Sequence, residues 1–271
     1  MTGFRDRVLA TIEAHGPLCV GIDPHFELLR AWGLDDGAAG VREFGLRVVD
    51  AASGRLGFLK PQIAFFERHG AAGYAALEEV LAAGRAAGIL MIADVKRGDV
   101  GSTVDAYGEA WLTPGSPLEA DAMTAVAYQG FGSLDGVLAR AASHDKGVFV
   151  LAATSNPESA GVQTLRGETG ETLAASMVRD AVATGGTAGV VVGATVDLDA
   201  AGIDAELLGR VPVLAPGFGA QGAQLTDAPA LFGTALGSVI PNAARSVLGA
   251  GPDGLVRAID AARTEVSSWA R

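Results

Sequence analysis

Two carboxylates and two basic side chains stand within six positions of the sequence, directly after the apolar run ILMI. Residues 93–103 read ADVKRGDVGST. Because side chains alternate along an extended strand, Asp94 and Lys96 are predicted to point to the same side and Val95 to the other. Asp99 follows in a glycine-containing loop and is close enough along the chain to turn back toward Lys96. A carboxylate beside an ammonium group can transfer protons or stabilise charge, although the same cluster can be a solvated set of salt bridges without function.

The use of lysine favours the first interpretation. Of the 20 basic residues only Lys60, Lys96 and Lys146 are lysines, so this chain places arginine almost wherever a positive charge is needed. Lys60 and Lys96 each end an apolar run, and lysine can lose a proton whereas arginine stays charged in proteins. Their position indicates acid/base or charge chemistry, with Lys60 as the partner of Lys96. Lys146 begins an apolar run instead, and we expect it to be a solvated charge.

Eight short apolar runs recur along the chain, each followed by a polar or glycine-containing stretch and then an alanine-rich segment. Continuous apolar runs are typical of strands buried on both faces, as in a parallel sheet covered by helices. The segments between them end in glycines that resemble helix C-caps. Eight such units without a linker predict a single (β/α)8 TIM barrel, with residues 1–271 as one domain; a doubly wound open sheet is the alternative. The runs are LCVGIDP, GFLKPQ, ILMIADVK, EADAMTAVAY, KGVFVLAAT, AGVVVGAT, PVLAPGFG and SVIPNAAR.

Composition excludes several classes of partner. A net charge of -11 argues against binding to nucleic acid or to an anionic membrane surface, because both favour a basic face. The single cysteine, Cys19, lies in the apolar run LCVGI, so we expect a small buried side chain and no intrachain disulfide. Phe4, Val8, Leu9 and Ile12 share one face of a predicted N-terminal helix that lacks the apolar core of a signal peptide. No run is long enough to span a membrane, and we expect a cytoplasmic protein.

The predicted strand ends of the barrel are unusually polar. In TIM barrels catalytic groups gather where strands end and the following loops begin, so these residues are expected to face one site. They are Asp23, Lys60, Asp94, Lys96, Thr154, Ser155 and Arg245.

The loops after the seventh and eighth strands indicate a phosphate site. They contain APGFGAQG and NAARS, and in TIM barrels these two loops commonly hold phosphate. Gly217, Gly219 and Gly222 would let backbone N–H groups approach an anion, and Arg245 could bind it through two donors. The glycines alone are a weak signal, since the chain has 38 of them.

Six motifs, taken in order, resemble the orotidine 5'-phosphate decarboxylases, most closely the longer bacterial branch of that family. They are GIDP, FLKPQ, DVKRGDVGST, ATSNP, PGFGAQG and the arginine of NAARS, and they extend from the first strand to the eighth. The DxKxxD pattern alone is shared with related sugar-phosphate decarboxylases, but the ordered set is specific. The resemblance implies decarboxylation of orotidine 5'-monophosphate to uridine 5'-monophosphate in pyrimidine biosynthesis, with no cofactor and no metal.

The resemblance also implies a role for each matching position, with Lys96 as the proton donor to C6. It implies a homodimer with shared active sites, in which Asp99 and Thr103 enter the site of the neighbouring subunit. One departure follows the fourth strand, where relatives usually carry Asn-Pro-Tyr and this chain has VAY at positions 126–128. The implied roles are the charged array for Lys60, Asp94, Lys96 and Asp99, the ribose for Asp23, Lys60 and Thr103, the pyrimidine for Ser155, and the phosphate for Gln221 and Arg245.

Three other functions are compatible with such a barrel. A Schiff-base aldolase needs a lysine in or near the barrel, often on the sixth strand, where AGVVVGAT has none; Lys60 or Lys96 would have to serve. A magnesium-dependent sugar-phosphate decarboxylase needs further oxygen ligands around Asp94, where the second strand supplies the cation Lys60. The third is a protein that binds nucleotide phosphates without catalysis.

Overall fold

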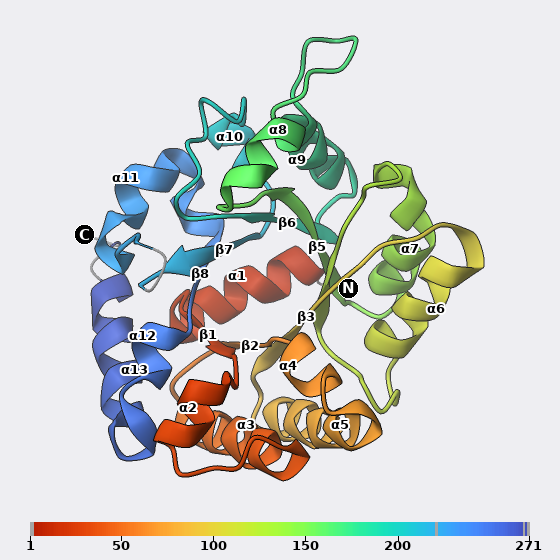
Figure 1. The fold of residues 1–271 in the computed structure, drawn as a ribbon. Coiled ribbons are helices and arrows are strands. Elements are labelled where there is room, and N and C mark those ends of the chain that lie inside the picture. The colour runs from red at the N-terminus through yellow and green to blue at the C-terminus, as the bar shows by residue number, and fades with distance from the viewer. Residues whose placement is uncertain (1–2, 220–221, 268, 270–271) are drawn as a thin grey trace.

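The predicted (β/α)8 barrel is confirmed. The computed structural model describes residues 3–219, 222–267 and 269. Its strands pair in parallel, each with the next along the chain, and β8 pairs with β1 to close the barrel (Figure 1). The strands are β1 (Cys19–Ile22), β2 (Phe58–Pro61), β3 (Leu90–Arg97), β4 (Ala122–Ala125), β5 (Gly147–Ala153), β6 (Ala188–Val192), β7 (Val213–Phe218) and β8 (Val239–Ala243).

Helices surround the barrel as an outer ring, and their apolar faces pack on the outward-facing side chains of the strands (Figure 1). No helix in the described part of the chain is long and apolar enough to cross a membrane. The helices are α1 (Phe4–His15), α2 (Phe26–Ala31), α3 (Ala38–Ala52), α4 (Ala64–Glu67), α5 (Gly70–Ala86), α6 (Gly101–Leu112), α7 (Asp135–Ser143), α8 (Ala160–Gln163), α9 (Leu173–Ala183), α10 (Ala205–Leu208), α11 (Ala228–Phe232), α12 (Arg245–Leu248) and α13 (Gly251–Ser267).

The inside of the barrel is apolar toward the strand starts and polar toward the strand ends. Phe58 and Ile92 belong to the buried interior cluster, and the next inward positions along the same strands are Lys60 and Asp94. This order follows from the two-residue alternation of side chains along each strand. The apolar interior cluster comprises Phe4, Val8, Cys19, Phe58, Leu90, Ile92, Ala122, Phe149, Val191, Leu214 and Ile240.

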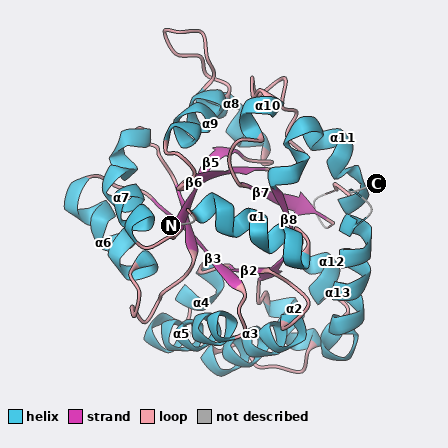
Figure 2. Cartoon of the chain, turned by 180° about the vertical axis from the view of Figure 1, so that it is seen from behind, coloured by secondary structure: helices cyan, strands magenta, loops and turns pink. Residues whose placement is uncertain are grey.

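Helix α1 closes the barrel at the end where the strands begin. Figure 2, which views the molecule from behind, shows α1 lying across the barrel. The ring of Phe4 meets the ring of Phe149 edge to face, with centroids 5.8 Å apart. Gly147 permits this contact, because a Cβ atom there would lie 2.1 Å from the ring of Phe4. Only the opposite end of the barrel is therefore available for a site.

The prediction that Lys146 is a solvated charge is wrong. Its side chain is buried with 6% relative exposure, and its Nζ lies 2.8 Å from Glu119 Oε1 and 3.7 Å from Asp121 Oδ1. Asp121 also accepts a hydrogen bond from Arg7 of α1 at 2.7 Å and one from the backbone N–H of Met91 at 3.0 Å. The side chain of Lys146 is therefore part of a charge cluster that holds α1 against the end of the barrel where the strands begin.

Candidate active site

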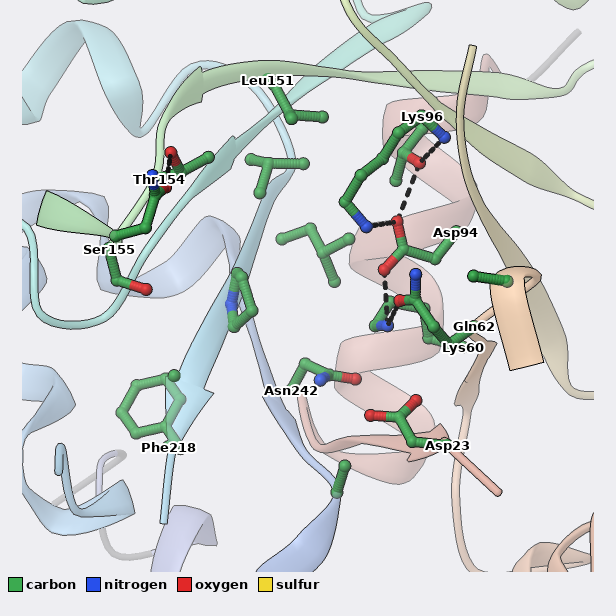
Figure 3. Close-up of a pocket in the computed structure, with 18 of the residues that line it drawn as sticks. Asp23, Lys60, Gln62, Asp94, Lys96, Leu151, Thr154, Ser155, Phe218 and Asn242 are labelled. Carbon is green, nitrogen blue, oxygen red and sulfur yellow. Dashed lines mark hydrogen bonds and ion pairs between the residues drawn. The ribbon is translucent and has the colours of Figure 1, made fainter. Parts of the chain in front are cut away.

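A cavity of about 640 Å³ opens at the carboxyl ends of the strands, above the apolar interior (Figure 3). Side chains from all eight strands or from the loops that follow them line it. Eight of the residues predicted to form the site are among them: Asp23, Lys60, Asp94, Lys96, Thr154, Ser155, Gly217 and Arg245. The lining also includes five polar residues that sequence reasoning did not assign to the site, namely His25, Gln62, Thr124, Asn156 and Asn242.

Asp94 joins the two lysines of adjacent strands into one charged array. Its Oδ2 accepts a hydrogen bond from Lys60 Nζ at 2.8 Å, and its Oδ1 accepts one from Lys96 Nζ at 2.5 Å (Figure 3). The predicted proximity of Asp94 and Lys96 is confirmed, and Val95 faces the outer core as expected. Lys60 and Asp94 are buried, with 3% and 7% relative exposure, whereas the side chain of Lys96 extends into the cavity.

Lys60 and Asp94 remain charged although they are buried, because each lies beside an opposite charge. Burial alone would raise the pKa of Asp94, but the charges of Lys60 and Lys96 and their hydrogen bonds lower it well below its ordinary value. Burial alone would lower the pKa of Lys60, but the negative charges of Asp94 and Asp23 outweigh it and raise that pKa. At the neighbouring thiol of Cys19, burial outweighs the charge of Lys60 and raises the pKa to about 12.

A threonine on the next strand completes the contacts of Asp94. Thr124 lies near the end of β4, two residues after the inward-facing Ala122, and is almost fully buried. Its hydroxyl donates to Asp94 Oδ1 at 2.9 Å and accepts the backbone N–H of Lys96, also at 2.9 Å. The alternation that located Lys60 on β2 would also have found Thr124.

Two buried oxygens face the cavity without a hydrogen-bond partner among the described residues. They are Oδ1 of Asp23, after β1, and Oδ1 of Asn242, near the end of the neighbouring β8 (Figure 3). Gly21 gives the Asp23 carboxylate its room, since a Cβ atom there would lie 3.1 Å from Asp23 Oδ1. Buried acceptors are rarely left unpaired in native proteins. The two oxygens are therefore available to donors of a bound ligand.

The loop after β5 presents Ser155 to the cavity from the side opposite Lys60 (Figure 3). Gln163, nine residues after Thr154, fixes the start of this loop. Its side-chain oxygen accepts the backbone N–H of Thr154 at 2.8 Å, and its side-chain nitrogen donates to the hydroxyl of Thr154 at 3.0 Å.

Only some of the residues predicted to bind phosphate line the cavity. Gly217 and Arg245 line the cavity, and Arg245 begins α12 with an exposed side chain. Gly219 does not line it, and its backbone N–H already donates to the carbonyl of Ala223 at 2.7 Å. With φ of 79°, Gly219 forms a tight turn that uses this N–H. The prediction that the N–H of Gly219 approaches an anion is therefore wrong. Gln221 lies outside the described residues.

Asp99 and Thr103 do not line the cavity of their own chain. The Asp99 carboxylate accepts the neighbouring N–H of Val100, and no ion pair joins it to Lys96 within the described residues. The expected return of Asp99 toward Lys96 is therefore wrong for a single chain. The backbone N–H of Val126 donates to the carbonyl of Arg97 at 2.9 Å, which joins the ends of β3 and β4. Position 126 thus contributes a backbone contact in place of a polar side chain.

The described residues offer no group of three or more histidine, cysteine, aspartate or glutamate side chains placed to hold a metal ion. Near Asp94, the oxygens of Thr124 and Gln62 are already bonded to Lys96 and Lys60. Two of the three side-chain donors to the Asp94 carboxylate are ammonium groups, whereas a divalent metal requires further oxygen ligands there.

Comparison with known proteins agrees with this geometry over nearly the whole chain. The model of the orotidine 5'-phosphate decarboxylase / HUMPS family matches residues 16–259. Orotidine 5'-phosphate decarboxylases of a Nocardioides species and of Streptomyces coelicolor are 48% and 46% identical over 257 and 260 residues; the matches cover 92% and 93% of this chain and 92% of each relative. A crystal structure from Streptomyces avermitilis superposes with a TM-score of 0.94 at 44% identity, covering 99% of this chain and 96% of that one. The OMP decarboxylase of Leishmania donovani gives 0.79 at 32% identity, covering 98% of each chain. With its charged array at the strand ends of a closed barrel, the chain belongs to the orotidine 5'-phosphate decarboxylase / HUMPS family.

Proposed function

We propose that this chain converts orotidine 5'-monophosphate to uridine 5'-monophosphate without a cofactor, and that Lys96 protonates C6. Its family and its relatives named orotidine 5'-phosphate decarboxylase make it a carboxy-lyase of pyrimidine biosynthesis. The observation that carries the mechanism is the array of Lys60, Asp94 and Lys96, whose exposed member reaches into the cavity.

The reaction needs a fixed cation next to C6. When the bond from C6 to the carboxylate breaks, CO2 leaves and the electron pair stays on C6 in an in-plane orbital that the ring cannot delocalise. The Lys96 ammonium offsets this charge and then transfers a proton to C6, after which water reprotonates the amine. Asp94 fixes the ammonium by its 2.5 Å contact and places a negative charge near the departing carboxylate. Like charges in a closed site raise the energy of the ground state.

The remaining lining fits the other parts of the nucleotide. Arg245 supplies a charge for the phosphate at the end of the cavity formed by β7 and β8, and binding energy gained there helps to hold the substrate in place for reaction. The unpaired oxygens of Asp23 and Asn242 are acceptors for the ribose hydroxyls. Ser155 faces the array across the cavity, where the pyrimidine would lie between them (Figure 3).

Loss of ultraviolet absorbance from orotidine 5'-monophosphate tests this function directly, with and without EDTA. We expect activity that EDTA leaves unchanged, which neither a magnesium-dependent decarboxylase nor a non-catalytic binding protein would show. Lys96→Ala should remove the activity while the thermal unfolding transition is retained, because the proton donor and the counter-charge are lost together. Substantial turnover by Lys96→Ala would refute the mechanism, and an inactive wild type would refute the function.

We also propose that the active unit is a homodimer with shared sites, to which Asp99 and Thr103 of one subunit contribute in the other. Both residues lie outside the cavity of their own chain, and Thr103 is exposed. The large apolar side chains of Val100 and Tyr128 follow the adjacent strands β3 and β4, and they are 54% and 86% exposed. A partner subunit that covers this side of the barrel would bury both side chains.

Complementation distinguishes shared sites from separate ones. A mixed dimer of Lys96→Ala and Asp99→Ala carries both lesions in one site and none in the other. About half of randomly paired dimers are mixed, so activity should return to roughly a quarter of wild type. Lys96→Ala paired with Lys60→Ala is the control, because both residues serve their own chain and every site keeps one lesion. Confirmed mixed dimers of the first pair without recovery would disprove the shared site.

The domain organisation and location complete the proposal. We take residues 1–271 as a single catalytic domain, since the barrel uses β1 at one end of the sequence and packs α13 at the other. We also propose a cytoplasmic location, which a single buried cysteine, Cys19, supports. Limited proteolysis would release a stable fragment if a second domain existed, and cell fractionation tests the location.

A further inference from the structure

We propose that Thr124 is a positioning residue for the decarboxylation, because its hydroxyl fixes both the backbone of Lys96 and the carboxylate that holds the Lys96 ammonium. The inference rests on the proposed function and adds a residue that touches neither the substrate nor the reacting atoms.

The Thr124 hydroxyl makes two hydrogen bonds, one as an acceptor and one as a donor. The backbone N–H of Lys96 can only donate, so Thr124 Oγ1 accepts it at 2.9 Å. The hydroxyl proton is then directed to Asp94 Oδ1, also at 2.9 Å. The same carboxylate oxygen lies 2.5 Å from Lys96 Nζ. Thr124 thereby links the two ends of Lys96, its main chain and, through Asp94, its ammonium group.

The backbone at Lys96 needs such a link because it leaves the regular strand. Ala93 pairs with Met123, but the next paired residues are Arg97 and Ala125, so β3 advances four residues where β4 advances two. Within this irregularity Lys96 has φ of 47°, the left-handed region that residues other than glycine rarely adopt. Among the described residues only Asp145 shares this feature. A strained conformation of this kind persists only where its surroundings hold it.

Loss of the hydroxyl should therefore displace the ammonium and leave the rest of the cavity intact. The residues proposed for the phosphate and the ribose, Arg245 and Asp23, follow β8 and β1 and make no contact with Thr124 among the hydrogen bonds of the described residues. Substrate affinity should persist while the proton donor is misplaced. This predicts an effect on kcat with little effect on KM.

The test compares Thr124→Val, which has nearly the same shape without the hydroxyl, with Thr124→Ser, which keeps it. Thr172→Val is the matched control. The Thr172 hydroxyl is equally buried, accepts the N–H of Ala175 at 3.0 Å and donates to the carbonyl of Ala201 at 2.6 Å, away from the cavity. We expect kcat on orotidine 5'-monophosphate to fall about 10- to 100-fold in Thr124→Val, as for loss of a hydrogen bond to a charged group, with KM changed less than threefold. Thr124→Ser should stay within about threefold of wild type, and Thr172→Val should keep its kcat.

Hydrogen exchange of the Lys96 amide, measured by NMR without substrate, provides a second readout that does not depend on activity. It should accelerate in Thr124→Val and stay slow in wild type, Thr124→Ser and Thr172→Val. If Thr124→Val does not fold, Thr124→Ala replaces it, since water from the cavity can fill the space. An active wild type with undiminished kcat in the hydroxyl-free variant would overturn the inference alone, as would unchanged amide exchange. An inactive wild type would overturn the proposed function, and the exchange rates would still decide the placement of Lys96.

Discussion

Replacing Asp94 by asparagine should destabilise the fold, because it leaves the ammonium of Lys60 buried without its main counter-charge. The substitution keeps the shape of the side chain and removes only the charge. Lys60 has 3% relative exposure, and its other hydrogen bond among the described residues is a 3.4 Å contact with Gln62. Neither water nor the Gln62 amide can replace a carboxylate 2.8 Å away.

The size of the effect follows from this distance. Two unit charges 2.8 Å apart attract by about 6 kcal/mol at an effective dielectric constant of about 20. The variant also avoids the cost of burying the Asp94 charge, which offsets part of this loss. We therefore expect the free energy of unfolding at pH 7 to fall by about 3–5 kcal/mol, the range typical of breaking a buried pair from one side.

The pH dependence of stability identifies Lys60 as the cause. In the wild type the pKa of Lys60 is raised, so its stabilisation is complete below about pH 10.4 and declines only as the pH rises above that value. In Asp94→Asn, burial is opposed mainly by Asp23, and the folded-state pKa of Lys60 should drop below that of the unfolded chain. The unfolded state then binds more protons, and the variant should gain stability from pH 7 to pH 9 while the wild type does not.

Urea unfolding followed by circular dichroism at several pH values measures both effects. Adding Lys60→Met to Asp94→Asn should restore part of the stability, since no unpaired charge remains. Glu79→Gln is the surface control, because it breaks the exposed pair with Arg42 and should leave stability nearly unchanged. A loss below about 1 kcal/mol in Asp94→Asn, or a loss that does not shrink with rising pH, would refute the electrostatic account.

Three further substitutions test other parts of the molecule. Arg245→Ala should lower kcat/KM for orotidine 5'-monophosphate by about 100-fold but hardly affect phosphate-free orotidine, since a charge-assisted contact is lost; equal losses would remove Arg245 from the phosphate site. Asn242→Ala should raise KM for the ribonucleotide more than for its deoxyribose analogues, because it removes an acceptor for a hydroxyl; a uniform change would contradict that contact. Lys146→Met should lower the free energy of unfolding by about 1–3 kcal/mol while kcat stays at the wild-type value, and reduced kcat in folded enzyme would contradict its purely structural role.

The barrel and most of its polar interior could be predicted from the sequence because both follow from local periodicity. Eight continuous apolar runs require eight strands covered on both faces, and a parallel sheet of that kind closes readily. Within each run, side chains two residues apart share a face, which places Lys60 after Phe58 and Asp94 after Ile92. Parallel pairing of consecutive strands then brings β2 and β3 together, and the pairing of Lys60 with Asp94 follows.

Local periodicity directs Thr124 and Asn242 inward, but it does not reveal what these residues do. Thr124 reads as an ordinary β-branched strand residue, and its role arises from a register shift that exists only once β3 and β4 are paired. Asn242 resembles a turn residue before a helix, although its spacing from Ile240 directs it inward. Gly219 was expected to bind an anion because glycine permits close approach, but the same freedom of φ serves the turn that uses its N–H.

The three lysines show most clearly which features of the site local periodicity does not reveal. All three lysines pair with carboxylates, which indicates that scarcity of lysine marks sites where a compact ammonium group meets aspartate or glutamate. Lys60 and Lys146 are equally buried, so burial and pairing alone do not separate a structural from a functional charge. The difference lies in what stands beside the pair: α1 and Arg7 cover the cluster of Lys146, whereas the array of Lys60 borders a cavity large enough for a nucleotide. Lys146 is covered by α1 and stabilises the fold, whereas Lys60 belongs to an array at the wall of the cavity that can act on a bound substrate.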